Sequence, residues 1–401
     1  MISLSNLSDE RMRHAKSGQW WEHAGHRALA NNSVAYTEKP DVGVFMQEWL
    51  SLYESKSGER GIFNREASKK VVASNGRRDP NHEWGTNPCS EIILRPEQFC
   101  NLSEVVVRVD DTYESLAEKV EAATILGTWQ STLTEFPQLF GDWEKNTSEE
   151  RLLGVSLTGI LDNKFMGDPD NKALPTRLSD LRKHAVEINK YYAAKLGIEQ
   201  STAVTAVKPS GTVSQLVNSA SGIHTRHSDY YIRTVRGDNK DPLTQFMKDM
   251  GIPNEPCVMR PESTTVFSFP VKSPDGATTR DHLDAVQHFK LWLLYQEHWC
   301  EHKPSVTINV REHEWPMIGA MVWEHFDKVS GVSFLPHDGG SYRQAPYQEV
   351  TKEVYEEALS KMPSNIDWSN LRNYEVDDNT TGTQEFACTA GVCEVVDLTA
   401  R

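Results

Sequence analysis

The sequence is poor in long apolar runs and in positive charge. No stretch of roughly 18 consecutive apolar residues occurs, which excludes a membrane-spanning helix. The beginning of the chain, MISLSNLSDERM, has neither the basic start nor the apolar stretch of a signal peptide, so we expect a cytoplasmic protein with no membrane partner. The 42 basic and 57 acidic residues give a formal net charge of −15, which argues against a surface that binds nucleic acid.

Cysteine is also scarce, with six in 401 residues. This number does not provide the disulfide framework of a secreted domain, and in a reducing cytosol paired cysteines are more often catalytic or metal-binding. We expect Cys257 to be a loop thiol and Cys300 to lie in the core or at a helix end. Cys300 stands between His298 and His302, but residues two apart on a helix do not point together, so we expect no metal held by protein side chains.

The chain alternates between helical and strand-like patterns. Helical periodicity occurs at 115–135, 176–196, 282–298 and 351–361. Short β-rich runs occur at 201–207, 229–235, 264–269, 305–310 and 331–335. This alternation predicts an α/β fold with a parallel sheet or barrel over residues 1–365. The polar, aperiodic residues that follow predict a flexible linker and tail over 366–401.

The stretch NPCSEIILRPEQFC, residues 87–100, combines two cysteines with an amide and a carboxyl group. If residues 87–91 are extended, Asn87, Cys89 and Glu91 face the same way, with neighbours roughly 6.6 Å apart. Together they offer a hydrogen-bonding amide, a reactive sulfur and a general base within reach of one small substrate. The alternative is that the cysteines are ordinary buried thiols, because free cysteine is among the most buried residue types.

A turn at Pro96–Glu97 would fold this stretch into a hairpin. Such a hairpin pairs Ile93 with Cys100 and leaves Cys89 roughly 13 Å from that site. We therefore expect no Cys89–Cys100 disulfide, and Cys100 needs a separate role or a partner elsewhere.

A second cysteine pair lies near the C-terminus, in EFACTAGVCEVVD. Cys388 and Cys393 are separated by small residues that let a loop close, and a polar stretch precedes them. This arrangement is typical of a mobile dithiol that reaches a buried disulfide and then a soluble reductant. The alternative is an accidental pair on a disordered tail.

The segment TAVKPSGTVSQL, 205–216, indicates a strand that turns into a helix. Backbone N–H groups and hydroxyls at such a turn can bind a phosphate, although the spacing is not that of a Walker A motif. The alternative is an ordinary capped helix start. The candidate phosphate-binding residues are Ser210, Gly211, Thr212, Val213 and Ser214. In the next segment, 221–236, His and Arg side chains either line the same cavity or pack at a strand edge.

These segments together resemble the adenosylcobalamin-dependent, class II ribonucleotide reductases. NPCSE resembles the finger-loop motif of that family, FCNL resembles the site of a reducing cysteine, and ACTAGVC resembles the tail pair. KPSGTVSQL is similar to the substrate-phosphate loop, and SGIHTRHSDYYIRTVR also looks like a class II segment. Each motif is weak alone, but the resemblance extends over essentially the whole chain.

The resemblance implies a role for each residue of the first motif. Cys89 would hold a thiyl radical that abstracts the 3′-hydrogen of the ribose. Glu91 would take the proton of the 3′-hydroxyl, and Asn87 would hydrogen-bond the sugar. Cys100 would be half of the dithiol that reduces the substrate.

The resemblance also implies a cofactor and partners. Adenosylcobalamin would generate the radical, and its cobalt would be carried by the corrin. The substrate would be a ribonucleoside di- or triphosphate. Cys388 and Cys393 would relay electrons from a thioredoxin-like reductant.

In this family the partner of the Cys100-type residue lies on an early strand of a ten-stranded α/β barrel. No cysteine precedes Cys89 here. We therefore expect the C-terminal half of such a barrel, with a finger loop at 85–102 and with Met1 inside what is normally a strand. Activity would then require a complementing N-terminal half.

Two alternatives to this function are a non-catalytic fragment and a simple dithiol oxidoreductase. The fragment would bind nucleotide or its complementing half without reducing anything. The oxidoreductase would use only Cys388 and Cys393, which leaves Asn87 and Glu91 without a purpose. The tyrosine pairs and the tail glycine are not placed as a class I radical relay or a class III glycyl-radical loop would require.

Overall fold

The computed structural model describes residues 2–18, 20, 24, 26–27, 30–258, 260–337 and 344–376. Cys388 and Cys393, and the expected linker from residue 377 onward, lie outside the described residues. None of the described helices is both long and apolar enough to cross a bilayer.

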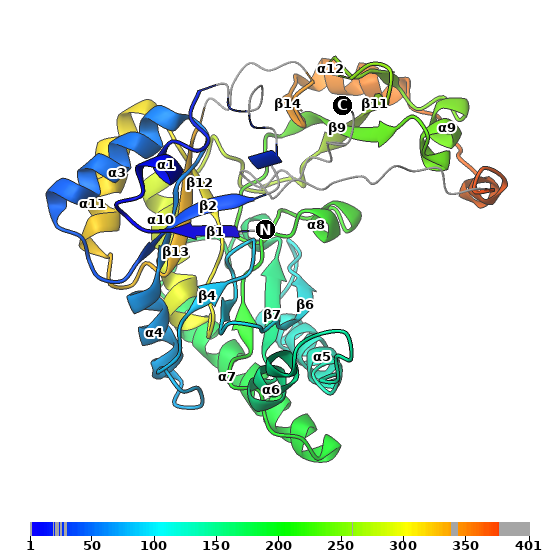
Figure 1. The fold of residues 1–401 in the computed structure, drawn as a ribbon. Helices are drawn as coiled ribbons and strands as arrows, with labels where there is room; N and C mark the ends of the chain where they lie inside the picture. Colours follow the sequence, from blue (N-terminus) through cyan, green and yellow to red (C-terminus); the bar gives the residue numbers. More distant parts are fainter. Residues whose placement is uncertain are drawn as a thin grey trace.

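Two sheets form the main body of the protein (Figure 1). The first is parallel, with the order β6 (Asn101–Val106), β7 (Leu153–Thr158), β8 (Thr205–Ala206). The second has the order β1 (Ile2–Ser5), β2 (Asn31–Tyr36), β3 (Gly61–Asn64), β13 (Gly331–Pro336), β12 (Thr307–Val310). A parallel bridge between Val207 and Pro304 joins the two sheets at β8 and β12.

The two joined sheets belong to the expected α/β class, but they contain more strands than half of a ten-stranded barrel. From β6 to β13 the neighbouring strands are parallel. β3 is antiparallel to β13, and β1 and β2 are parallel to β3. The described chain therefore supplies three further strands of opposite direction beside the five that a half-barrel needs. Closure into a complete barrel stays a prediction.

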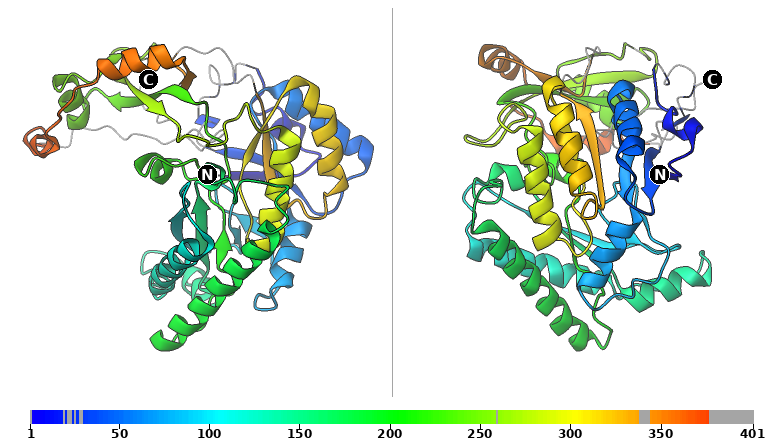
Figure 2. Two further views of the ribbon diagram at one scale, coloured as in Figure 1. Left: turned by 180° about the vertical axis from the view of Figure 1, so that it is seen from behind. Right: turned by 90° about the vertical axis from the view of Figure 1, so that its left-hand side faces the viewer.

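Helices lie against these sheets and shield an extensive core (Figure 2). They are α3 (Val42–Ser55), α4 (Arg65–Ser74), α5 (Tyr113–Gln130), α6 (Gly141–Glu150), α7 (Leu174–Leu196), α10 (Ala285–His298) and α11 (Trp315–Glu324). All six residues of β7 are buried, as expected for a strand with both faces covered. The predicted helices at 115–135, 176–196, 282–298 and 351–361 are all confirmed, the last as α12 (Lys352–Ser360).

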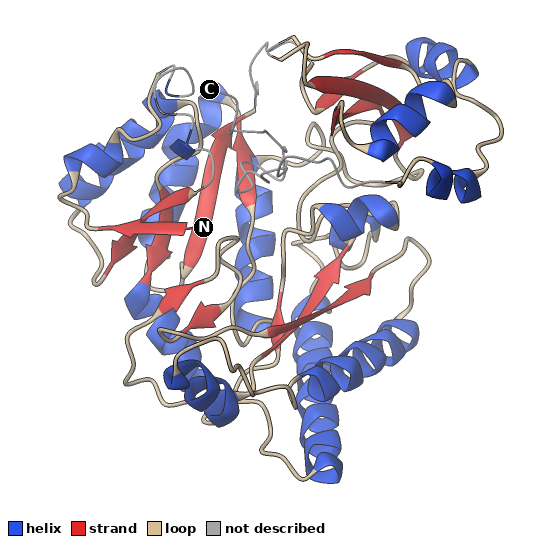
Figure 3. Cartoon of the chain, turned by 45° about the vertical axis from the view of Figure 1, so that its right-hand side comes forward, coloured by secondary structure: helices blue, strands red, loops and turns tan. Residues whose placement is uncertain are grey.

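A smaller antiparallel sheet forms a separate layer with its own core (Figure 3). Its order is β10 (Asn254–Pro256), β11 (Thr264–Lys272), β9 (Tyr230–Asp238), β14 (Tyr347–Glu349). The strands predicted at 229–235 and 264–269 are therefore present, but they do not belong to a parallel sheet. Their mixture of buried and half-buried residues is typical of an antiparallel sheet with one covered face.

Part of the segment expected to be a linker packs against this smaller core. Residues Trp368–Asn373 form the 3-10 helix η4, and Ile366, Leu371 and Tyr374 contact the cluster around Phe246 of α9 (Pro242–Asp249). The boundary expected at residue 366 is therefore too early, because these apolar side chains have a core to join.

Gly222 shows how closely the chain packs behind the predicted phosphate loop. Its φ is +54°, and a Cβ atom there would lie 2.3 Å from the carbonyl oxygen of Lys208. Gly197, which ends α7, has a similar φ of +69° but no atom within 4 Å of the same position. A substitution by alanine at each of these two glycines therefore distinguishes the cost of a left-handed backbone from the additional cost of a steric clash.

We predict that Gly197→Ala lowers the free energy of unfolding by about 1 kcal/mol, the cost of a left-handed alanine. Gly222→Ala should lower it by about 1–3 kcal/mol more, because the backbone at Lys208 must also move. Urea denaturation of both variants measures the difference. Equal losses would contradict the close packing against Lys208.

Candidate active site

Cys89 lies at the tip of a short hairpin loop, residues 87–92. The loop joins β4 (Gly85–Thr86) to β5 (Ile93–Leu94), which pair Gly85 with Leu94 and Thr86 with Ile93. The prediction of a hairpin about Pro96–Glu97 is therefore wrong. The sequence pattern did not indicate the observed hairpin, because its two strands contain only two residues each.

The loop is a turn rather than an extended strand, so the predicted alternation of side chains is also wrong. The N–H of Ser90 donates to the carbonyl of Asn87 at 2.9 Å, and Ser90 has a left-handed φ of 67°. The side-chain oxygen of Asn87 accepts from the N–H of Ile92 at 2.9 Å and thereby closes the loop. Asn87 therefore shapes the loop, and its amide N–H₂ group remains for another partner.

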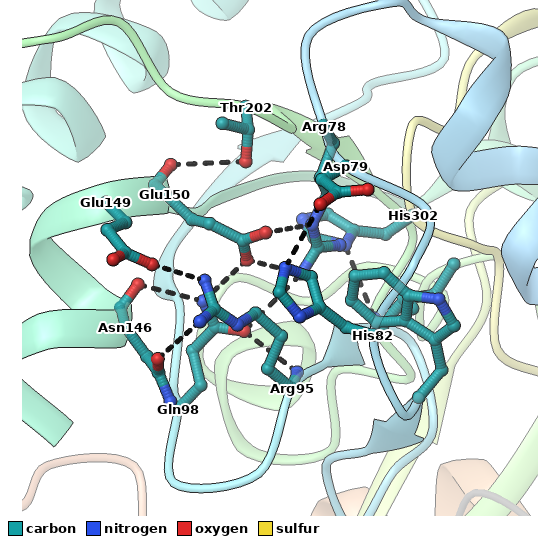
Figure 4. A network of polar contacts seen from close by, with 12 residues as sticks. Arg78, Asp79, His82, Arg95, Gln98, Asn146, Glu149, Glu150, Thr202 and His302 are labelled. Atoms are coloured by element: carbon teal, nitrogen blue, oxygen red, sulfur yellow. Dashed lines mark hydrogen bonds and ion pairs between the residues drawn. The ribbon is translucent and has the colours of Figure 1, made fainter. Parts of the chain in front are cut away.

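A buried polar network holds the base of the hairpin against α6 (Figure 4). The Arg78 guanidinium donates to both carboxylate oxygens of Glu150, at 3.0 and 2.7 Å, and Gln98 donates to one of them at 2.6 Å. The ring of Trp84 lies 4.5 Å from Arg78. Breaking such a buried pair costs about 3–5 kcal/mol, so this network holds the base of the hairpin in place.

A different set of contacts holds the tip of the loop. Asn31 donates to the carbonyl of Pro88 at 2.8 Å, and Ser305 donates to the carbonyl of Cys89 at 2.5 Å. Lys303 donates from its backbone to the carbonyl of Glu91 at 3.1 Å. The tip is thus bound to residues at the start of β2 and just before β12.

The tip of the loop lines a pocket together with residues of the five-stranded sheet. Its lining residues come from the loop, from all five strands of this sheet, from the segments that precede them, and from the segments around Pro209 and His224: Ile2, Asn31, Asn32, Ser33, Ser57, Gly58, Glu59, Ile62, Pro88, Cys89, Ser90, Pro209, His224, Ser305, Val306, Thr307, Gly331, Val332, Ser333 and Leu335. Most of these side chains are small or polar, so the pocket is suited to a polar ligand rather than an apolar one.

Lys208 is the charged centre of the site. Its Nζ lies 3.1 Å from Glu91 Oε1, and the Glu91 side chain is completely buried. Burial alone would lower the pKa of Lys208, but the negative charge of Glu91, and then of Cys89, raises it overall. Lys208 therefore stays protonated and pairs with a carboxylate that water does not reach.

Both cysteines near Lys208 are held as thiols. Burial raises the pKa of Cys89, the charge of Glu91 adds to this, and Lys208 opposes it. Burial and Glu91 also raise the pKa of Cys100. A nucleophilic cysteine requires a lowered pKa, whereas a hydrogen atom is lost from an S–H group. The raised pKa values therefore argue against a nucleophilic thiolate at either sulfur. Cys89 and Cys100 are both free thiols in the structure.

The predicted phosphate loop lies at the end of β8 and begins the short helix α8 (Thr212–Leu216). The Ser210 hydroxyl donates to Glu104 at 2.7 Å, and the Ser214 hydroxyl donates to the carbonyl of Ser210. These two hydroxyls are engaged within the protein, whereas Thr212 and Val213 are exposed and Gly211 caps the helix. Phosphate binding by Ser210, Gly211, Thr212, Val213 and Ser214 stays a prediction.

The following segment divides into a pocket residue and a structural one. His224 lines the pocket, and its Nε2 accepts from the N–H of Thr307 at 3.0 Å. Burial lowers the pKa of His224 to about 4, so the ring is neutral. Arg226 instead forms a buried two-pronged ion pair with Asp162, at 2.8 Å for both bonds.

The sequence pattern predicted no separate role for Lys208, Glu104 or Lys303. Lys208 is the first residue of the motif KPSGTVSQL, and Glu104 lies two residues after the motif FCNL, so closeness to these motifs was the available signal. No signal indicated Lys303. Cys257 and Cys300 are both buried. Among the described residues, no group of three or more His, Cys, Asp or Glu could hold a metal ion.

Comparison with known proteins identifies one kind of relative. No family model matches the chain. The adenosylcobalamin-dependent ribonucleoside-triphosphate reductase of Lactobacillus gasseri is 28% identical over 92% of this chain and 53% of its own length. The enzyme of the same name from Euglena gracilis is 28% identical over 78% of this chain and 43% of its own length.

A solved structure of a B12-dependent (class II) ribonucleotide reductase matches with a TM-score of 0.75 and 26% identity, over 94% of this chain and 56% of that chain. The chain thus spans about half the length of the relatives it matches. The predicted resemblance to the adenosylcobalamin-dependent, class II ribonucleotide reductases is therefore confirmed over nearly all of this chain.

Proposed function

We propose that this chain carries the radical-bearing loop of an adenosylcobalamin-dependent reductase that converts ribonucleotides into 2′-deoxyribonucleotides. The observation that carries the proposal is the grouping of a protonated Cys89 with Glu91 and Cys100 around Lys208. The names of the relatives favour a ribonucleoside triphosphate as substrate.

The proposed reaction replaces the 2′-hydroxyl of the ribose by hydrogen. A Cys89 thiyl radical takes the 3′-hydrogen atom and later returns it. Glu91 accepts the proton of the 3′-hydroxyl, and Lys208 stabilises the carboxylate until it does so. The 2′-oxygen leaves as water, and a dithiol that includes Cys100 supplies two electrons and two protons as it becomes a disulfide.

The remaining proposed contacts place the substrate. The amide N–H₂ group of Asn87 would donate to a sugar hydroxyl, because its oxygen already holds the loop. The substrate phosphates would bind at the start of α8, where Ser210, Gly211, Thr212, Val213 and Ser214 lie. Lys208 lies between this loop and Glu91 and adds positive charge on the phosphate side.

The pocket beside Cys89 has features that fit the adenosyl part of the cofactor. Asn32 Oδ1 and Glu59 Oε2 are buried acceptors without a partner among the described residues, and both residues line the pocket. Sugar hydroxyls or an amino group would satisfy them. When bound, adenosylcobalamin supplies the one-electron oxidation that makes a thiyl radical from a thiol.

Cys388 and Cys393 would deliver electrons to the site from a thioredoxin-like reductant, and a complementing N-terminal half would complete it. Two facts support the second part. The chain spans about half the length of its relatives, and the other described cysteines, Cys257 and Cys300, are both buried free thiols.

Replacing the proposed radical residue tests the function directly. We expect the chain, mixed with a complementing N-terminal half, adenosylcobalamin, a ribonucleoside triphosphate and a small dithiol, to form deoxyribonucleotide. Cys89→Ser should abolish product formation, because an O–H bond is too strong to replace the S–H bond, while Cys257→Ser should retain it. Product from Cys89→Ser would contradict the radical role. An inert mixture whose halves still bind each other would favour a non-catalytic fragment.

The charges around Cys89 can be tested on the chain alone. Glu91→Gln removes a charge that raises the pKa of Cys89, so its alkylation by iodoacetamide at pH 8 should become faster. Lys208→Met removes a charge that lowers this pKa, so alkylation should become slower. Each unit of pKa changes the thiolate fraction about tenfold. Peptide-resolved mass spectrometry measures the rate, and changes in the same direction would contradict the arrangement.

The tail cysteines can be separated from the site by the choice of reductant. In the reconstituted mixture, Cys388→Ser should lose turnover with thioredoxin and keep it with a small dithiol that reaches the site by diffusion. The control is Ser369→Ala, an exposed substitution in η4 outside the tail. Loss of turnover with both reductants would show that Cys388 acts in the site itself.

A further inference from the structure

Lys303 is a buried charged group that the proposed reaction does not use. Its side chain has 0% exposure, and its Nζ lies 4.3 Å from the centre of the Phe63 ring. Glu91, the carboxylate that acts on it, pairs with Lys208 instead. A buried ammonium group without a direct carboxylate partner is costly, so its presence calls for an explanation.

The surrounding structure makes room for this amine. A Cβ atom at Gly331, the first residue of β13, would lie 2.7 Å from Lys303 Nζ, so only glycine leaves the space free. Burial lowers the pKa of Lys303 to about 7, although the charge of Glu91 opposes this. The protein thus keeps a destabilised amine in a fitted site directly behind the loop.

The amine is directed at the tip of the loop. Lys303 Nζ donates to Ser90 Oγ at 2.7 Å. The backbone N–H of Lys303 donates to the carbonyl of Glu91, and Ser305 donates to the carbonyl of Cys89. One short segment therefore contacts three consecutive loop residues, and Cys89 is the first of them.

The contact to Ser90 is made at the residue of the loop whose backbone conformation is least favourable. Ser90 has a φ of 67°, a conformation that residues other than glycine adopt at a cost. The hydrogen bond from the Lys303 amine can offset such a cost. Without it, the turn is free to relax, and the position of the Cys89 sulfur changes with it.

We propose that Lys303 is a positioning residue, whose bond to Ser90 holds the loop of residues 87–92 so that Cys89 faces the pocket. The inference rests on the proposed function only in taking Cys89 as the reactive group. The positioning itself is a property of the chain without substrate or cofactor.

The test uses alkylation of Cys89 in the full chain, resolved by peptide mass spectrometry. Lys303→Met and Ser90→Ala should each accelerate it about tenfold, the effect of losing one buried hydrogen bond. The double variant should be no faster than either single variant, because both remove the same bond. Lys183→Met, on an exposed face of α7, is the matched control and should match the unchanged chain.

The pH dependence tests whether Lys303 is a buried amine whose charged form is destabilised, as opposed to a side chain that only fills space. A lysine whose pKa is about 7 in the folded chain and about 10.4 when unfolded binds fewer protons when folded between these values. Its contribution to stability therefore rises with pH across this window. The urea midpoint of the unchanged chain should rise relative to that of Lys303→Met from pH 7 to 10. Glu91 and His302, whose charges interact with Lys303, and the neighbouring Lys208 are present in both proteins.

Unchanged alkylation of Cys89 in both single variants, or additive effects in the double variant, would overturn the proposal. A midpoint difference that does not vary with pH would reduce Lys303 to a packing residue. If Lys303→Met fails to fold, the buried Cys257 and Cys300 also react, and Ser90→Ala alone then decides. None of these measurements involves turnover, so their failure is distinct from failure of the proposed reductase activity.

Discussion

The rest of the site depends on the burial of the Glu91 carboxylate. A completely buried carboxylate is tolerated only with positive charge and hydrogen-bond donors beside it. Lys208 lies just after the end of β8, and Lys303 lies in the segment before β12. These two strand ends must therefore be neighbours, and the bridge between Val207 and Pro304 makes them so. The contact that joins the two sheets therefore also brings the two lysines to the buried carboxylate of the loop.

The sequence was sufficient for elements that are defined by local pattern. The helix predicted at 176–196 is observed at Leu174–Leu196, because its apolar spacing is regular and Gly197 ends it with a left-handed residue. The strands predicted at 305–310 and 331–335 are also present, as β12 and β13. Strand direction was not predictable for 229–235 and 264–269, since it depends on which neighbours each strand meets in space.

The shape of the loop could not be predicted because distant residues determine it. Its tip is held by Asn31, Lys303 and Ser305, which are 57, 213 and 216 residues away from their partners. A local reading favours a turn at Pro96 and expects a lysine such as Lys303 to be exposed. The types of the site residues were easier to predict than their arrangement, since Asn87, Cys89 and Glu91 are recognisable in the sequence before their positions in space are known.

The protonation state of Cys89 links the loop to the chemistry we propose. The same carboxylate that would accept a proton from the substrate also acts, with burial, to keep the Cys89 sulfur protonated. An ionised Glu91 therefore prepares both partners at once, because it is ready as a base while the neighbouring sulfur retains its hydrogen. Once Glu91 takes up a proton, its negative charge no longer acts on the thiol, and Lys208 is left with no carboxylate partner at this position. In the proposed reaction the acid–base step and the state of the sulfur would therefore be coupled, because one lysine acts on both groups.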